Sequence, residues 1–184
     1  MQIDPLPLEF LSNHLSYTIR SAIEGDAEAL SELRVQIDGE TENLDREKGE
    51  AYIDEAEFTA IIRDDSKNFN SLFLVAVADG QLTAFSRCAG KQLKRTYHQT
   101  EFGVAVLKRY WGYGIGQHLL NESIRWADAN NIKKITLSVL ETNDKAIKLY
   151  EKYDFEVEGI LKKDKLLSDG NYYNTLLMGR INQK

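Results

Sequence analysis

The sequence contains a single cysteine, Cys88, only two prolines and three histidines among its 184 residues. One cysteine cannot form an internal disulfide, and no Cys/His cluster has the spacing of metal ligands, so we expect no structural disulfide and no metal cofactor. The longest apolar run, Leu72 to Ala78, is too short to cross a bilayer, and the N-terminus lacks the pattern of a secretion signal. These absences predict a cytoplasmic chain without a membrane partner.

Positive charge is also scarce, because 23 Lys and Arg stand against 29 Asp and Glu and give a net charge of −6. Nucleic-acid binding depends on clustered basic residues, so we expect no nucleic-acid partner. The acidic balance mildly favours cationic substrates. The length, with 42% hydrophobic residues, is typical of one domain with a sizeable core.

Residues 101–117 predict a strand that ends in a glycine-rich turn and a helix start. Apolar residues alternate along this strand at Phe102, Val104 and Val106, which predicts one buried face. The other face carries a single carboxylate and otherwise little bulk, so a ligand could lie against it. That second face consists of Glu101, Gly103 and Ala105.

Three glycines, Gly112, Gly114 and Gly116, follow at alternate positions and let backbone N–H groups turn inward at the helix start, where phosphate is favoured. A dinucleotide-binding turn would need a third glycine at Gln117, and a nucleoside-triphosphate loop would need Gly-Lys-Ser/Thr, which the chain lacks. The remaining pattern, Arg109-x-x-Gly112-x-Gly114, resembles the phosphate loop of the GNAT superfamily of N-acetyltransferases. A glycine-rich turn without a ligand is the alternative.

The rest of the chain predicts the order β-α-α-β-β-β-α-β-α-β-β. Residues 1–16 are interpreted as an N-terminal arm and residues 17–184 as a single N-acetyltransferase domain. Strands are predicted at 17–22, 72–78, 81–89, 96–106, 134–139, 155–167 and 172–181, and helices at 26–37, 50–63, from the glycine loop to 130, and 143–153. The third of these helices connects strands that should run parallel in one sheet.

A second block strengthens the resemblance: Asn143 to Lys152 is similar to the family segment in which the asparagine contacts the pantetheine arm and the tyrosine, here Tyr150, faces the thioester sulfur. The similarity covers roughly Tyr17 to Arg180. It implies an α/β GNAT fold, in which a mixed, largely antiparallel, twisted sheet is flanked by helices on both faces. It also implies acetyl-CoA as co-substrate and acetyl transfer to a primary amine of a small molecule or a protein. A non-catalytic acyl-CoA sensor or interaction module is the alternative, and a homodimer is left open.

The resemblance assigns the acetyl-CoA grip to the glycine loop, to the preceding strand as a partner for the pantetheine arm, and to the start of the later helix. An N–H group between Gly103 and Val106, aimed by a β-bulge, would stabilise the oxyanion. The candidate cofactor-binding residues are Val104, Ala105, Val106, Arg109, Tyr110, Trp111, Gly112, Tyr113, Gly114, Ile115, Gly116, Asn143 and Ala146.

Two residues are the catalytic candidates. Tyr150, a phenol with a pKa near ~10, can give a proton to a thiolate whose own pKa is around ~8.5. Glu101 can take the proton of an amine that is mostly charged at neutral pH, and His98 acting through a water is the alternative base. Each also has a structural interpretation, Tyr150 as a core residue and Glu101 as a solvated carboxylate. The acidic connection 38–49 is expected to border the acceptor pocket.

Overall fold

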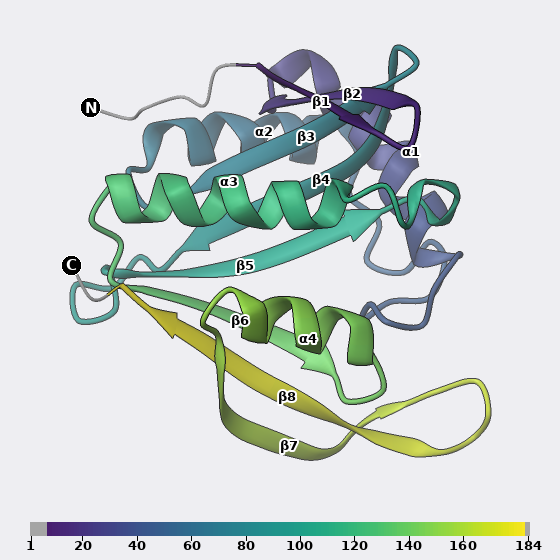
Figure 1. The fold of residues 1–184 in the computed structure, drawn as a ribbon, viewed down its shortest axis with the longest axis vertical. Helices are drawn as coiled ribbons and strands as arrows, with labels where there is room; N and C mark the ends of the chain where they lie inside the picture. Colours follow the sequence, from purple (N-terminus) through teal and green to yellow (C-terminus); the bar gives the residue numbers. More distant parts are fainter. Residues whose placement is uncertain (1–6, 183–184) are drawn as a thin grey trace.

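The computed structural model describes residues 7–182 and contains one eight-stranded sheet with the strand order β1-β2-β3-β4-β5-β6-β8-β7 (Figure 1). The strands are β1 (Leu8–Ser12), β2 (Leu15–Ser21), β3 (Leu72–Ala78), β4 (Gln81–Gly90), β5 (Gln99–Val106), β6 (Lys134–Leu140), β7 (Glu156–Leu166) and β8 (Tyr172–Ile181). The helices are α1 (Ala27–Asp38), α2 (Glu55–Lys67), α3 (Ile115–Ala129) and α4 (Asp144–Lys152), with short 3₁₀ turns at Glu24–Asp26 and Lys108–Tyr110. All neighbouring strands are antiparallel except β5 and β6.

Helices cover both faces of the sheet, as predicted: α3 and α4 lie over one face and α1 and α2 over the other (Figure 1). The alternation along β3 shows how the core is divided. Leu72 and Leu74 belong to the cluster under α3, whereas Phe73 and Val75 pack with α1 and α2. A strand covered on both faces reads as an unbroken apolar run, which explains the longest such run in the sequence.

Strand β1 lies in the stretch interpreted as an N-terminal arm, and the predicted order did not contain it. It pairs with β2 through a turn in which Asn13 and His14 both have positive φ, 47° and 67°. The division of the chain at residue 17 stays an interpretation of the sequence, while residues 8–12 pair with the sheet of the predicted domain.

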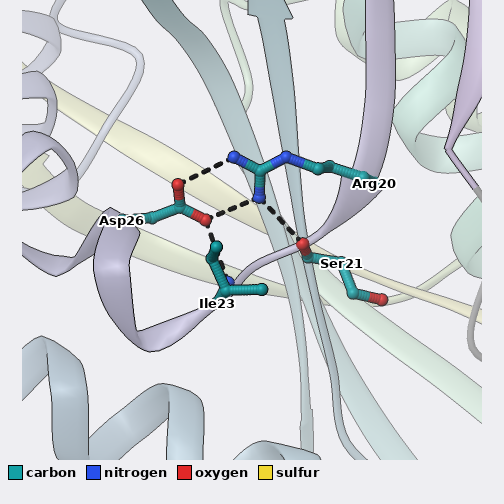
Figure 2. Close-up of polar contacts among 4 residues, drawn as sticks. All are labelled: Arg20, Ser21, Ile23 and Asp26. Atoms are coloured by element: carbon teal, nitrogen blue, oxygen red, sulfur yellow. Dashed lines mark hydrogen bonds and ion pairs between the residues drawn. The ribbon is translucent and has the colours of Figure 1, made fainter.

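The passage from β2 into α1 is fixed by an ion pair (Figure 2). Both terminal nitrogens of Arg20 donate to the Asp26 carboxylate, at 2.7 and 2.8 Å, and one of them also donates to the Ser21 carbonyl at 3.0 Å. The Ile23 N–H donates to the same carboxylate at 2.9 Å. These bonds constrain the turn that connects the end of β2 to the start of α1.

Helix α2 begins later than predicted, at Glu55 instead of 50. Asp54 and Glu57 form a reciprocal capping box, in which the Glu57 N–H donates to Asp54 at 2.9 Å and the Asp54 N–H donates to Glu57 at 3.0 Å. This cap satisfies N–H groups at the helix start and sets the boundary. Residues 39–54 thus form a longer connection beside the sheet than the sequence analysis expected.

The parallel pairing of β5 with β6 is confirmed, but it extends over only Gln99 to Glu101. Beyond that point the two strands diverge, as the teal and green arrows of Figure 1 show. The prediction of a β-bulge between Gly103 and Val106 was wrong, because β5 pairs with β4 in unbroken register from Ala84↔Val106 to Gly90↔Thr100. Divergence from β6, and not a bulge, exposes this part of β5.

Candidate active site

A cleft of about 480 Å³ opens where β5 and β6 separate. Its wall is formed by the connection after α1, strands β4, β5 and β6, the glycine loop and the start of α4. This volume lies in the range of small-molecule sites in proteins. The cleft collects residues from both sequence blocks that carry the resemblance, so these blocks form one site.

The main chain of β5 offers hydrogen-bonding groups to this cleft. The Leu107 N–H donates to the Thr83 carbonyl of the β4 side at 3.0 Å. Because successive residues of a strand turn their N–H and C=O groups to opposite sides, Val104 and Val106 turn theirs toward the departing β6. The indole N–H of Trp111 donates to the Val106 carbonyl at 2.8 Å. An extended, amide-bearing ligand can therefore pair with Val104 and with the Val106 N–H.

The glycine loop forms an anion-binding helix start. Gly112 and Gly114 have φ of 88° and 80°, a region that residues with a Cβ rarely adopt, and α3 begins at Ile115. The His118 N–H donates to the Gly114 carbonyl at 2.9 Å, the first bond of the helix. The N–H groups before His118 have no partner inside the helix and lie at its positive end. This arrangement suits a pyrophosphate.

Two side chains support the loop from the sheet side. The Tyr17 hydroxyl lies 2.6 Å from Nδ1 of His118 and donates to the Tyr113 carbonyl at 3.3 Å. The ring of Phe10 stacks on His118 with centroids 4.2 Å apart. Burial raises the pKa of Tyr17 to about 12 and lowers the pKa of His118, so both side chains are neutral at pH 7.

Tyr150 reaches the cleft from α4, whose first turn is capped by Asn143: the Ala146 N–H donates to the Asn143 side chain at 3.3 Å. The Tyr150 side chain is buried and packs against Phe155, with ring centroids 5.8 Å apart. Within residues 7–182 its hydroxyl has no hydrogen-bond partner. Burial raises the pKa of Tyr150 to about 12, so the hydroxyl keeps its proton at neutral pH.

Glu101 lies on the cleft wall at the last residue of β5 that pairs with β6. Its side chain is about half exposed, and one carboxylate oxygen lies 3.3 Å from Nζ of Lys91. His98 is exposed and is not among the residues that line the cleft; its carbonyl accepts from the N–H groups of Lys133 and Lys134. Glu101 therefore lines the cleft, whereas His98 does not.

Apart from Arg109 and Tyr113, every predicted site residue lines the cleft. Arg109 is exposed, and its guanidinium carbon lies 5.0 Å from the ring centroid of Tyr110. Tyr113 is half-buried against the core under α3 and contributes the carbonyl that Tyr17 holds. Ala105 lines the cleft and also packs with the core on the side of α1 and α2.

Sequence reasoning missed two arginines of the cleft, Arg46 and Arg87. Arg46 donates to Asp38 through Nε at 3.0 Å and through Nη2 at 3.1 Å. Arg87 donates to Asp65 in the same way, at 2.6 and 2.9 Å. The acidic connection after α1 was a signal for Arg46, whereas nothing local in the sequence distinguishes Arg87.

The connection after α1 is bonded on one side to the residue before the glycine loop and on the other to the last hairpin. Glu40 accepts from the Lys108 N–H beside the glycine loop at 2.7 Å, and Glu42 accepts from the Ser168 N–H in the last hairpin at 2.8 Å. Asp45 forms an ion pair with Lys165 of β7. The expectation that this acidic segment borders the pocket is confirmed, since residues 41 and 43–46 line it.

Comparison with known proteins identifies this arrangement. Residues 38–155 match the model of the acetyltransferase (GNAT) family. The chain belongs to the GNAT family of acetyltransferases. The segment matched includes the diverging strands, the glycine loop and Tyr150, so this GNAT enzyme has the family's main elements within one contiguous part of its sequence.

Individual proteins similar to this chain are also acetyltransferases. AaaT, an L-amino acid N-acetyltransferase of Escherichia coli, is 35% identical over 109 residues, which cover 59% of this chain and 67% of that protein. A GNAT acetyltransferase structure from Streptococcus pneumoniae has a TM-score of 0.86 at 27% identity and covers 90% of this chain and 99% of its own. The yncA protein of Salmonella typhimurium, solved with its cofactor acetyl-CoA, has the same fold, with a TM-score of 0.79 at 18% identity over 91% of this chain and 95% of its own.

The enzyme is an acetyl-CoA-dependent N-acetyltransferase. The site fits this co-substrate, because it combines an anion-binding helix start with an exposed strand edge. Among residues 7–182 no group of three His, Cys, Asp or Glu is placed to hold a metal ion. No helix in the same range is long and apolar enough to cross a membrane.

Proposed function

We propose that Tyr150 and Glu101 carry the two proton transfers of this reaction and that the acceptor is a small molecule. The observation that carries the proposal is the buried Tyr150 side chain on the lining of the cleft that opens where β5 and β6 diverge; burial also raises its pKa to about 12. Acetyl-CoA supplies an acetyl thioester there. The residues of this chain bind the donor, orient the amine and move protons.

The donor is held by main-chain groups. The first turn of α3 and the loop from Tyr110 to Gly114 take the pyrophosphate, while Val104 and Val106 pair with the pantetheine amides. The N–H groups of these two residues, turned toward the opening, are also the donors nearest to a developing oxyanion. Asn143 caps α4 through its side chain and itself lines the cleft.

Glu101 accepts the proton of the incoming amine, and Tyr150 gives its proton to the departing sulfur. A carboxylate at the edge of the cleft, half exposed and only weakly paired with Lys91, can exchange this proton with solvent afterwards. Tyr150 suits the acid role because burial keeps it protonated and no residue of the described chain competes for its hydrogen. The two groups come from different elements, Glu101 from β5 and Tyr150 from α4.

A small-molecule acceptor is supported by the closure of the cleft. The connection after α1 is bonded to Lys108 at one end and to Lys165 and Ser168 at the other, so it narrows access for a folded protein. AaaT, which by its name acetylates L-amino acids, is an example of a relative with a small acceptor. The deciding experiment measures CoA thiol release with a panel of amines, amino acids and N-terminal peptides.

Acceptor-dependent thiol release with small amines supports the proposal. Release with peptides alone would contradict the small-molecule acceptor, and acetyl-CoA binding without release in any mixture would instead favour a sensor. Homodimer formation, a cytoplasmic location and the absence of nucleic-acid and membrane partners stay predictions. A homodimer is compatible with the edge strand β7, which among residues 7–182 pairs with β8 alone and exposes Val157, Ile160 and Leu161.

A further inference from the structure

Two arginines reach the same cleft from different elements, Arg46 from the connection after α1 and Arg87 from β4. Each is held by a carboxylate that the fold buries, with Asp38 only 1% and Asp65 only 5% exposed at the side chain. The arginine side chains are 30% and 38% exposed. Each guanidinium group is therefore held in place by a buried carboxylate, while part of the arginine side chain stays accessible to solvent.

The bonding pattern leaves hydrogen-bond donors available on each arginine. In both pairs the aspartate takes Nε and Nη2, and no residue between 7 and 182 accepts from Nη1 of Arg46 or Arg87. A guanidinium carries more N–H groups than these two bonds use, and they match a carboxylate in geometry.

The strand register places Arg87 next to the reacting region. Arg87 lies opposite Gly103, so both residues face the same side of the sheet, and Glu101 lies two positions along β5 on that face. An added Cβ at Gly103 would meet nothing within 4 Å, so this position leaves open space between Arg87 and Glu101. One face thus offers a positive and a negative group on either side of a gap.

Apolar side chains complete this end of the cleft. Ile37 of α1, Leu44 of the connection and Phe85 of β4 line the same cleft, and Phe85 lies two positions from Arg87 on the same face of β4. The remaining charged side chain of the connection that lines the cleft, Asp45, is paired with Lys165. A ligand that fits this surface has an ammonium group, an anionic group close to it and an apolar substituent.

We propose that the acceptor is an α-amino acid with an apolar side chain, whose carboxylate is bound by Arg87 and Arg46. Its amine faces Glu101 across Gly103, and its side chain packs against Ile37, Leu44 and Phe85. This proposal rests on the proposed function, since it specifies the acceptor of that same site. Arg87 and Arg46 are then specificity-determining residues, and Asp65 and Asp38 position them.

The test compares three acceptors that differ only at the carboxylate: leucine, leucinamide and 3-methylbutylamine. Steady-state thiol release from acetyl-CoA should give a kcat/KM for leucine about 100-fold or more above that for 3-methylbutylamine, since a site built to bind a charged group rejects the analogue that lacks it. Leucinamide should resemble 3-methylbutylamine when kcat/KM is expressed per uncharged amine, because the amine beside an amide loses its proton at a lower pH than an alkylamine. Equal values for the three acceptors would overturn the carboxylate proposal while the acetyl transfer itself stood. Release with none of them, but with other amines, would also overturn it.

The double variant Arg87→Met, Asp65→Leu removes the arginine without leaving a buried carboxylate unpaired. The ratio of kcat/KM between leucine and 3-methylbutylamine should fall by about 10-fold or more, mainly through the KM for leucine. The matched control is Arg180→Met, Asp128→Leu, which removes an ion pair of the same kind outside the residues that line the cleft. The control should keep the ratio, and an unchanged ratio in the Arg87 variant would contradict the proposal.

A measurement on the unaltered protein covers the case in which the double variant does not fold. 4-Methylpentanoate, which is leucine without its amine, should inhibit competitively against leucine and against 3-methylbutylamine with the same inhibition constant, because both acceptors share the site that it occupies. The neutral 4-methylpentanamide should inhibit neither. Absence of inhibition by the carboxylate would overturn the assignment of the arginines.

Discussion

Tyr17 and His118 meet at 2.6 Å although 101 positions separate them in the chain, and this contact joins the first hairpin to the helix that carries the anion-binding loop. The same tyrosine donates to the Tyr113 carbonyl, and the Phe10 ring of β1 stacks on His118. The helix start therefore depends on residues outside the contiguous segment that identifies the family. Loop geometry and acetyl-CoA affinity should respond to changes at this contact.

Tyr17→Phe should raise the KM for acetyl-CoA about threefold to tenfold and lower the free energy of unfolding by about 1 kcal/mol, because one hydroxyl with its bonds to His118 and Tyr113 is lost. The effect on kcat should be smaller than the effect on KM. Tyr173→Phe is the control, since it removes an exposed hydroxyl that donates to Asp169 at 2.5 Å, away from the loop. Equal effects of the two substitutions on KM would contradict the supporting role of Tyr17.

His118 should make stability fall as the pH is lowered. Burial holds the pKa of His118 below its usual value of 6.5, so the unfolded chain binds the proton more tightly than the folded one. The free energy of unfolding is then lost as the pH falls from about 6.5 toward the folded pKa. Denaturant unfolding between pH 7 and 5 should show a smaller loss for His118→Gln than for the unaltered protein. An identical loss would mean that carboxylates alone set this dependence.

Gly114→Val should abolish the rise in melting temperature that acetyl-CoA produces, because a β-branched side chain at φ of 80° strains the loop and obstructs the approach of the pyrophosphate. Gly170→Val provides a matched control, since Gly170 has the same φ of 80° in the last hairpin. Both variants should lose stability, and only the first should lose the ligand-induced shift. Micromolar acetyl-CoA binding by Gly114→Val would refute the loop assignment.

The parts of this site that the sequence revealed are local. The glycine loop occupies a few consecutive positions, so its residues are neighbours in any conformation. The Asn143 to Tyr150 segment occupies little more than two helical turns, so spacing alone predicts which of its residues share a helix face. Arg87 and Asp65 are 22 positions apart, one on β4 and the other on α2, and they meet only when this helix packs on the sheet. No local sequence pattern predicts that contact. The Tyr17–His118 contact is hidden for the same reason.

Three errors in the predicted fold have a different origin. Strand β1 was missed because Asn13 and His14 form its turn without the glycine that usually marks such hairpins. The start of α2 was misplaced although the Asp54 and Glu57 capping box is visible in the sequence. The predicted bulge in β5 followed from the need to expose an N–H group, a need that the divergence of β6 already meets.

Glu101→Gln should flatten the rise of kcat/KM between about pH 6 and 8 and approach the unaltered protein near ~10, where the amine loses its proton unaided. The experiment is a pH–rate profile with one accepted amine. Lys91→Met is the companion variant, because it removes the 3.3 Å partner of Glu101 and leaves the carboxylate in place. A uniform decrease at every pH would assign Glu101 to substrate positioning, and no decrease would assign the proton to solvent or His98.

The central claim, that Tyr150 supplies the proton for the departing sulfur, is tested most directly by single-turnover thiol release from Tyr150→Phe. The rate should fall by about 100-fold or more with acetyl-CoA affinity nearly unchanged, because the packed ring remains and only the hydroxyl is lost. Tyr153→Phe, on the next turn after α4 and outside the cleft lining, should react at the rate of the unaltered protein. A near-normal rate for Tyr150→Phe would contradict the account and leave Tyr150 as a core residue.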